Sequence, residues 1–196
     1  MDTRSVGTAL SNDDIASIHK AVEQRLEGGD IIRYHTAPQV GRNQTVGQHT
    51  WRGMVLLDTI WPAASTTVWR YFLYHDVGEL FTGAVPSPVK WRNKELHNQL
   101  NLMEAEALDK MSLPTFEDLD EYEQLLVEMI DVLELVLYCR PVVKMLPKAK
   151  EVHEAGIARI WKLSIALELL IKEAVENPIA VSARKSLNII RSMLSP

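Results

Sequence analysis

Apolar residues recur every three or four positions along most of the chain, which is the spacing of one face of an α-helix. No stretch alternates apolar and polar residues for long enough to predict a pair of strands. The periodic segments predict about seven helices, near residues 12–28, 46–61, 65–83, 96–111, 117–139, 147–175 and 178–194. We therefore expect an all-α helical bundle.

Capping and helix-breaking residues set the limits of these segments. Thr45 and Gln48 form a capping-box sequence that begins the second helix, whereas residues 30–44 before it look irregular. The third helix, near residues 65–83, is apolar on most sides and is expected in the middle of the bundle. Glycine and proline residues then predict a rigid, extended loop over residues 83–89.

The composition narrows the class of protein. The 196 residues are enough for one domain, and no repeat or linker divides them. The net charge of −5 argues against a general nucleic-acid binder. Because no apolar run approaches about 20 residues and the N-terminus lacks the apolar core of a secretion signal, we expect a cytoplasmic protein without a membrane partner. The one cysteine, Cys139, lies in an apolar run, which predicts a buried thiol and excludes a Cys-rich zinc motif.

Polar residues interrupt the otherwise apolar third helix. His75 and Asp76 are adjacent, and Glu79 follows three residues after Asp76, so the three side chains can share one face of a helix. Charged side chains on a buried helix need a partner or a metal ion. The string alone leaves two interpretations open, a solvated helix end or the ligands of a divalent cation.

Two further residues favour the metal site. His49 lies in the first turn of the second helix, and Asp131 is a short acid in the apolar stretch from Leu126 to Leu133. Aspartate is a poor residue for the middle of a helix, so a buried Asp131 requires a partner. Imidazole and carboxylate groups suit zinc, manganese, cobalt or iron.

Short motifs in a fixed order carry a resemblance to a known family. They are Arg33-Tyr34-His35-Thr36, Gln44-Thr45-Val46-Gly47-Gln48-His49-Thr50, His75-Asp76-Val77-Gly78-Glu79-Leu80-Phe81-Thr82-Gly83, Pro86-Ser87-Pro88-Val89-Lys90 and Asp131. With these motifs the chain resembles the HD superfamily of phosphohydrolases, in particular bacterial 5′-deoxynucleotidases and the dATP triphosphohydrolases of phages that carry 2-aminoadenine. The resemblance covers about residues 30–140. It implies a single HD domain over residues 1–196, completed by the helices of residues 147–194.

The resemblance also implies the roles of individual residues. One divalent ion (zinc, cobalt or manganese) would be held by His49, His75, Asp76 and Asp131, and a second divalent ion could accompany the substrate phosphates. Glu79 would act as general base or acid beside the attacking water. The expected substrate contacts are Arg33 on the phosphate, Tyr34 against the base, Lys90 on an extended phosphate chain and, less clearly assigned, His35 in the pocket.

Two positions depart from the family pattern. Ala84 stands where 5′-deoxynucleotidases have an aspartate that contacts the sugar, and Gln48 stands where a glutamate often precedes the first metal histidine. Ala84 favours hydrolysis of dATP to deoxyadenosine and triphosphate, which in a phage would take place in the host cytoplasm. The alternatives are a 5′-deoxynucleotidase acting on dNMPs and, from another class, a non-catalytic nucleotide-binding regulatory HD protein.

The resemblance further implies a homo-oligomer, either a dimer or a hexamer. The C-terminal helices carry apolar residues that could form subunit contacts: Ile157, Ile160, Trp161, Ile165 and Leu169.

Overall fold

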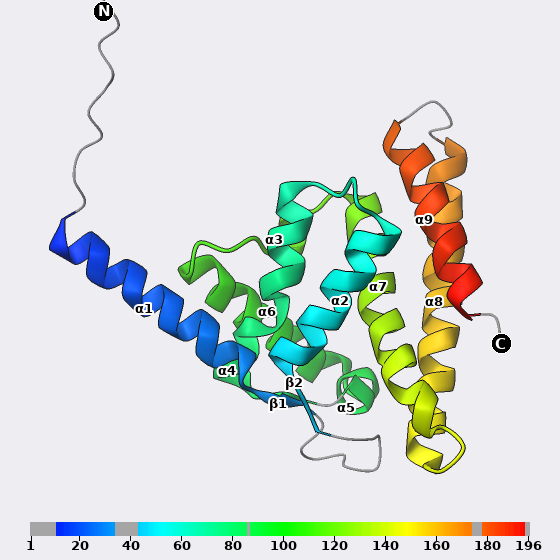
Figure 1. The fold of residues 1–196 in the computed structure, drawn as a ribbon, viewed down its shortest axis with the longest axis horizontal. Coiled ribbons are helices and arrows are strands. Elements are labelled where there is room, and N and C mark those ends of the chain that lie inside the picture. Colours follow the sequence, from blue (N-terminus) through cyan, green and yellow to red (C-terminus); the bar gives the residue numbers. More distant parts are fainter. Residues whose placement is uncertain (1–10, 34–42, 86, 174–177, 195–196) are drawn as a thin grey trace, which may run out of the picture.

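The computed structural model describes residues 11–33, 43–85, 87–173 and 178–194, and it is an all-α bundle as predicted (Figure 1). Within these ranges seven helices have nine or more residues: α1 (Asn12–Gly29), α2 (Val46–Ile60), α3 (Thr66–Tyr74), α6 (Lys94–Lys110), α7 (Glu121–Cys139), α8 (Pro147–Glu173) and α9 (Pro178–Leu194). The helix α2 begins at the predicted cap, since the side chain of Thr45 accepts a hydrogen bond from the backbone N–H of Gln48, and Ser11 caps the start of α1 in the same way through the N–H of Asp14. In the described part of the chain no helix is long and apolar enough to cross a membrane.

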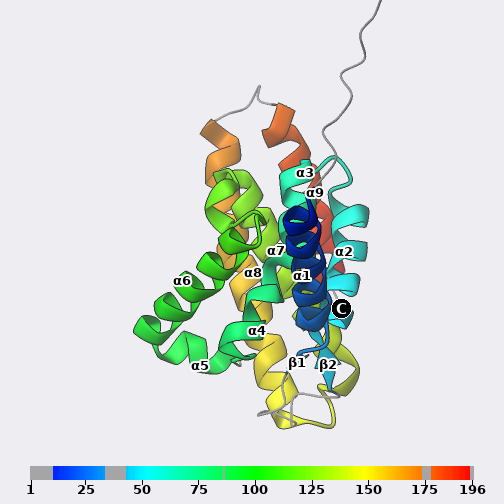
Figure 2. The ribbon, with the colours of Figure 1, turned by 90° about the vertical axis from the view of Figure 1, so that its left-hand side faces the viewer.

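The two short strands were not predicted. β1 (Ile32–Arg33) pairs antiparallel with β2 (Gln44–Thr45), with Arg33 opposite Gln44. Two residues are too few to produce a readable alternation of apolar and polar positions, so the sequence suggested only an irregular segment. This ribbon leads directly into α2 and lies at the same end of the bundle as α4 (Glu79–Thr82) and α5 (Ser87–Arg92) (Figure 1, Figure 2).

The extended loop predicted over residues 83–89 is wrong from Ser87 onward, where α5 begins. Proline is accepted in the first turn of a helix, since the backbone N–H that it lacks has no partner there, so Pro88 does not prevent the helix. Gly83 behaves as predicted: its φ of 73° ends α4 in a conformation that favours glycine.

The helix α7 begins four residues later than predicted, after the N-cap Asp120. The turn η3 (Phe116–Asp118) takes up the residues before it.

The middle of the bundle is formed by α7 and not by α3. The helix α7 is buried along most of its length, including Cys139 as predicted, and packs against α2, α8 and α9 (Figure 1). The helix α3 buries Val68 and Phe72 but leaves Leu73 41% exposed. The helix α3 therefore packs against α2 and α7 with one face, and its opposite face is exposed.

A close approach of α2 and α3 sets the position of the candidate site. A Cβ atom at Gly53 would lie 2.3 Å from Cε1 of Phe72, so only glycine permits this packing. His49 lies one helical turn before Gly53, and His75 lies three residues after Phe72. The close approach therefore brings the rings of His49 and His75 together, with 5.5 Å between their centroids.

Candidate metal centre

The single helix predicted over residues 65–83 is interrupted by a 3-10 turn at the His-Asp pair. The helix α3 ends at Tyr74, the 3-10 turn η2 (His75–Gly78) follows, and α4 begins at Glu79. Gly78 lies against the backbone of Glu104 on α6, where a Cβ atom would be 2.9 Å from the Glu104 Cα. A 3-10 segment inside a helix frequently marks a functional position. Here it carries two of the predicted ligands.

The four residues predicted as metal ligands lie together. His49 comes from the first turn of α2, and Asp131 from the middle of α7. The Nε2 atom of His49 lies 2.9 Å from Oδ1 of Asp131 and 3.6 Å from Oδ2 of Asp76. The Nε2 atom of His75 lies 3.3 Å from Oδ1 of Asp76 and 3.7 Å from Oδ1 of Asp131. Both imidazoles therefore direct Nε2 toward the same pair of carboxylates.

This arrangement fits a divalent cation. One ligand atom from each of His49, His75 and Asp131 lies within 4.8 Å of the others. The Nε2 atoms of both histidines are buried and make no hydrogen bond of regular geometry to the described residues; their nearest polar neighbours are the carboxylate oxygens of Asp76 and Asp131. Buried polar nitrogens without partners are costly, whereas a cation between them and the carboxylates would use their lone pairs. This set of imidazole and carboxylate donors suits zinc, cobalt and manganese alike.

Glu79 lies beside this cluster and is buried. Its Oε2 atom has no hydrogen-bond partner in the described part of the chain, and its Oε1 atom lies 3.9 Å from Nζ of Lys90. Burial and the charge of Asp76 raise the pKa of Glu79 to about 7, although Arg33 and Lys90 oppose the shift. A carboxyl group with this pKa can accept or release a proton near neutral pH.

The two predicted phosphate-binding cations contact acids of the site. The Nη1 atom of Arg33, on β1, donates to Oδ2 of Asp76 at 2.9 Å. Lys90, on α5, lies 3.6 Å from Oε1 of Glu104 in addition to its contact with Glu79. Both positive charges thus lie at the edge of the candidate cluster. The predicted substrate contacts of Tyr34 and His35 lie outside the described residues.

One polar residue of the site was missed in the sequence. Glu134 on α7 is fully buried, and its Oε2 atom lies 2.8 Å from Nδ1 of His49. The available signal was its spacing, because Glu134 follows Asp131 by about one helical turn and comes directly after the apolar stretch that ends at Leu133. Glutamate is common on helices, so this spacing did not distinguish it from a surface residue.

The protonation of the histidines predicts how the cluster responds to pH. Burial opposes a charge on His75, but Asp76 and Asp131 raise its pKa to about 9. Burial and Arg33 also oppose a charge on His49, but Asp131 and Glu134 raise its pKa above the usual value. At pH 7 His75 therefore holds a proton that a metal ion must displace, because only the neutral imidazole is a ligand.

Metal binding at pH 7 is accordingly expected to release about one proton, the one held by His75, and the affinity should increase as the pH rises toward 9. Calorimetric titration with zinc in buffers of different ionisation enthalpy measures this number directly. A binding enthalpy that is the same in every buffer would contradict the assignment of His49 and His75 as ligands.

One of three comparisons with known proteins found a match. Residues 61–145 match the model of a family described as 5′-deoxynucleotidase YfbR-like. This family belongs to the HD superfamily of metal-dependent phosphohydrolases, in line with the resemblance seen in the sequence. The matched segment covers less than half of the chain; it contains His75, Asp76, Glu79 and Asp131, whereas Arg33 and His49 precede it. No curated protein and no solved structure matches the chain.

Proposed function

We propose that the protein is a metal-dependent phosphohydrolase that cleaves 2′-deoxynucleotides at the α-phosphate, with deoxynucleoside monophosphates as the favoured substrates. The observation that carries the proposal is the convergence of two buried histidine Nε2 atoms and Asp131 within 4.8 Å. The family match over residues 61–145 supports this reaction, because the description of that family names a 5′-deoxynucleotidase. This match reverses the order of the two substrates expected from the sequence.

In this proposal His49, His75, Asp76 and Asp131 hold the cation. When bound, a divalent ion there supplies Lewis acidity to a phosphoryl oxygen. A second divalent ion that arrives with the substrate phosphates is compatible with the acidic surroundings.

The other residues bind the substrate and move protons. Arg33 and Lys90 offset the negative charge that accumulates on the phosphoryl oxygens. Glu79 takes a proton from the attacking water while the oxygen of that water forms a bond to phosphorus. The bond between phosphorus and the 5′ oxygen of the nucleoside breaks. The leaving 5′ oxygen takes up the proton that Glu79 has received, so that the nucleoside and phosphate are the products and Glu79 is ionised again.

The structure offers room for a small substrate beside the ligands. A cavity of about 380 Å³ adjoins His75 and Asp131 and is lined in addition by Tyr71, Asn101 and Phe116. Its volume lies within the range of about 300–1,000 Å³ that is usual for small-molecule sites. The aromatic rings in its wall could pack against a nucleobase.

Hydrolysis of dATP to deoxyadenosine and triphosphate is the second candidate. It is favoured by Ala84, a buried residue that offers no carboxylate to a sugar at the position where the resemblance places one. Removal of dATP in this way would suit a phage that carries 2-aminoadenine. A non-catalytic nucleotide-binding protein is less well supported, since Glu79 is present and buried beside the cluster.

Product analysis separates these candidates. The metal-loaded protein is incubated with each dNMP, each dNTP and the matching ribonucleotides, and the products are identified by chromatography and mass spectrometry. Inorganic phosphate and nucleoside from dNMPs, with dNTPs unchanged, is the expected result. Triphosphate and deoxyadenosine from dATP alone would establish the second candidate, and binding of nucleotide without any product would overturn both.

We also propose a homo-oligomer. Of the apolar residues predicted for subunit contacts on α8, Ile160 is buried in the bundle, whereas Trp161, Ile165 and Leu169 are 45–59% exposed. Exposed apolar residues on one helix commonly mark a contact surface.

Light scattering during size-exclusion chromatography should give a mass that is a multiple of 22.2 kDa, and replacing Ile165 and Leu169 with serine should reduce this mass. A monomeric mass for the unaltered protein would contradict this proposal.

A further inference from the structure

Glu134 occupies an unusual position for a carboxylate. It lies on α7, where Leu133 and Leu135 are its neighbours in sequence, and its side chain is fully buried. Three donors reach it: Nδ1 of His49 at 2.8 Å on Oε2, and Nε2 of Gln44 at 3.0 Å together with Nε of Arg52 on Oε1. A buried carboxylate is tolerated only when such donors satisfy it.

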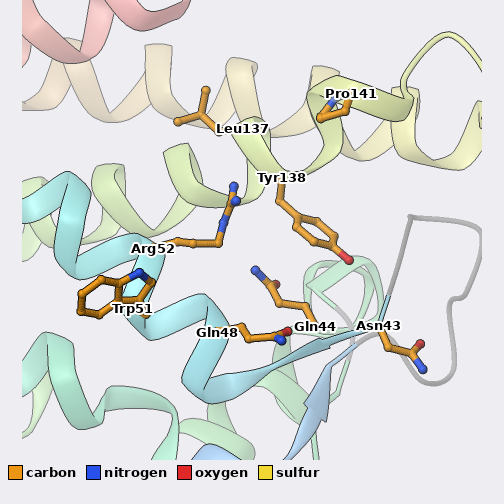
Figure 3. A pocket seen from close by; sticks show the side chains of 8 residues that line it. All are labelled: Asn43, Gln44, Gln48, Trp51, Arg52, Leu137, Tyr138 and Pro141. Atoms are coloured by element: carbon orange, nitrogen blue, oxygen red, sulfur yellow. The ribbon is translucent and has the colours of Figure 1, made fainter.

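The two donors other than His49 come from two elements and both contact Oε1 of Glu134. Gln44 extends from β2 and Arg52 from α2, and both lie around a surface pocket of about 370 Å³ (Figure 3). The guanidinium of Arg52 also lies over the ring of Tyr138, 5.9 Å from its centroid. Gln44 and Arg52 thus hold Oε1 of the glutamate, whereas His49 contacts Oε2.

The hydrogen bond to Glu134 determines the orientation of His49. A carboxylate paired with Arg52 can only accept hydrogen bonds, so Nδ1 of His49 must carry the proton and donate it. The lone pair of the neutral imidazole is then on Nε2, which lies toward Asp76 and Asp131. His75 is oriented in the same way, but its Nδ1 lies 2.9 Å from the backbone carbonyl of Phe72.

We propose that Glu134, held by Gln44 and Arg52, is a positioning residue that fixes the proton on Nδ1 of His49 and directs Nε2 into the metal site. The proposal rests on the assignment of His49 as a metal ligand in the proposed function. An acceptor on the outer nitrogen of a metal-bound histidine fixes the ring and increases its basicity, and losing it typically weakens metal binding by about 10- to 100-fold.

The test compares Glu134→Gln with Ser186→Ala. Glutamine keeps the size of the side chain but loses the charge that requires Nδ1 to be the donor. Ser186 is also buried, and its hydroxyl donates to the carbonyl of Ile60 away from the site. Zinc affinity, measured by competition with a chromophoric chelator, should fall about 10- to 100-fold in Glu134→Gln and stay unchanged in Ser186→Ala. Equal zinc affinity in Glu134→Gln and the unaltered protein would overturn the positioning role.

A second measurement uses the unaltered protein and does not depend on the folding of a variant. In ¹⁵N-correlated NMR spectra of the zinc-loaded protein, His49 should be protonated on Nδ1 and coordinated through Nε2. A His49 signal with Nδ1 unprotonated would overturn the inference even though zinc is bound. If instead the unaltered protein binds no zinc, the metal site itself fails, and with it the proposed function on which this inference rests.

Discussion

Asp131→Ala is expected to lose stable metal binding and, with it, hydrolysis. Asp131 lies within 2.9 Å of Nε2 of His49 and 3.7 Å of Nε2 of His75, so its carboxylate joins the two imidazoles. Its removal takes away a proposed ligand, whose loss should cost more than the roughly 10- to 100-fold typical of a residue that acts through a ligand. We therefore expect the affinity for zinc to fall by at least about 100-fold.

The metal content of the dialysed protein, measured by plasma mass spectrometry, tests this expectation. Glu121→Gln is the matched control, because Glu121 is an exposed acid in the first turn of the same helix, α7. Circular dichroism should show that both variants keep their helices. If Asp131→Ala keeps the metal content and turnover of the control, the ligand assignment is wrong.

Glu79→Gln is expected to keep the metal and to lose turnover by about 10²- to 10⁴-fold, the usual contribution of a general acid or base. Glutamine has the same shape as glutamate but cannot accept the proton of the attacking water. Metal content should stay near that of the unaltered protein, since the ligand cluster does not require Glu79. This pair of results separates a residue that moves a proton from one that holds the ion.

The pH dependence of turnover gives an independent measurement of Glu79. The residue must be ionised to accept a proton, so activity should rise with pH as Glu79 ionises. Its pKa of about 7 is the upper limit for this rise, because a bound cation favours the ionised form and lowers the pKa. Glu106→Gln, an exposed acid on α6, is the control that should keep both turnover and pH profile. Turnover of Glu79→Gln within tenfold of the unaltered protein would contradict its role.

Local signals in the sequence predicted much of the fold. Thr45 and Gln48 are only three residues apart, so the capping box that begins α2 could be read without knowledge of the rest of the chain. The strand pair of Arg33 with Gln44 could not be read in this way, because each strand has two residues and their pairing depends on contacts distant in sequence. The helix at Ser87 was hidden by prolines that are unfavourable in most helical positions but tolerated in the first turn.

The candidate site was predictable to the extent that its residues interrupt apolar faces. His75, Asp76 and Asp131 stand out because short polar side chains are unusual in buried helices. Their convergence with His49 was inferred from the resemblance, and the structure brings the four side chains together. Glu134 was not predicted because its role depends on the packing of α7 against α2, which places its carboxylate on Nδ1 of His49.

The most direct test of a metal-dependent phosphohydrolase is a titration of the metal-free protein with manganese or cobalt while the release of phosphate or triphosphate from deoxynucleotides is followed. The four proposed ligands around one position predict that turnover increases in proportion to added metal and reaches most of its maximum at one ion per chain. Full turnover in the metal-free protein, or no product from any deoxynucleotide at any metal concentration, would contradict the account.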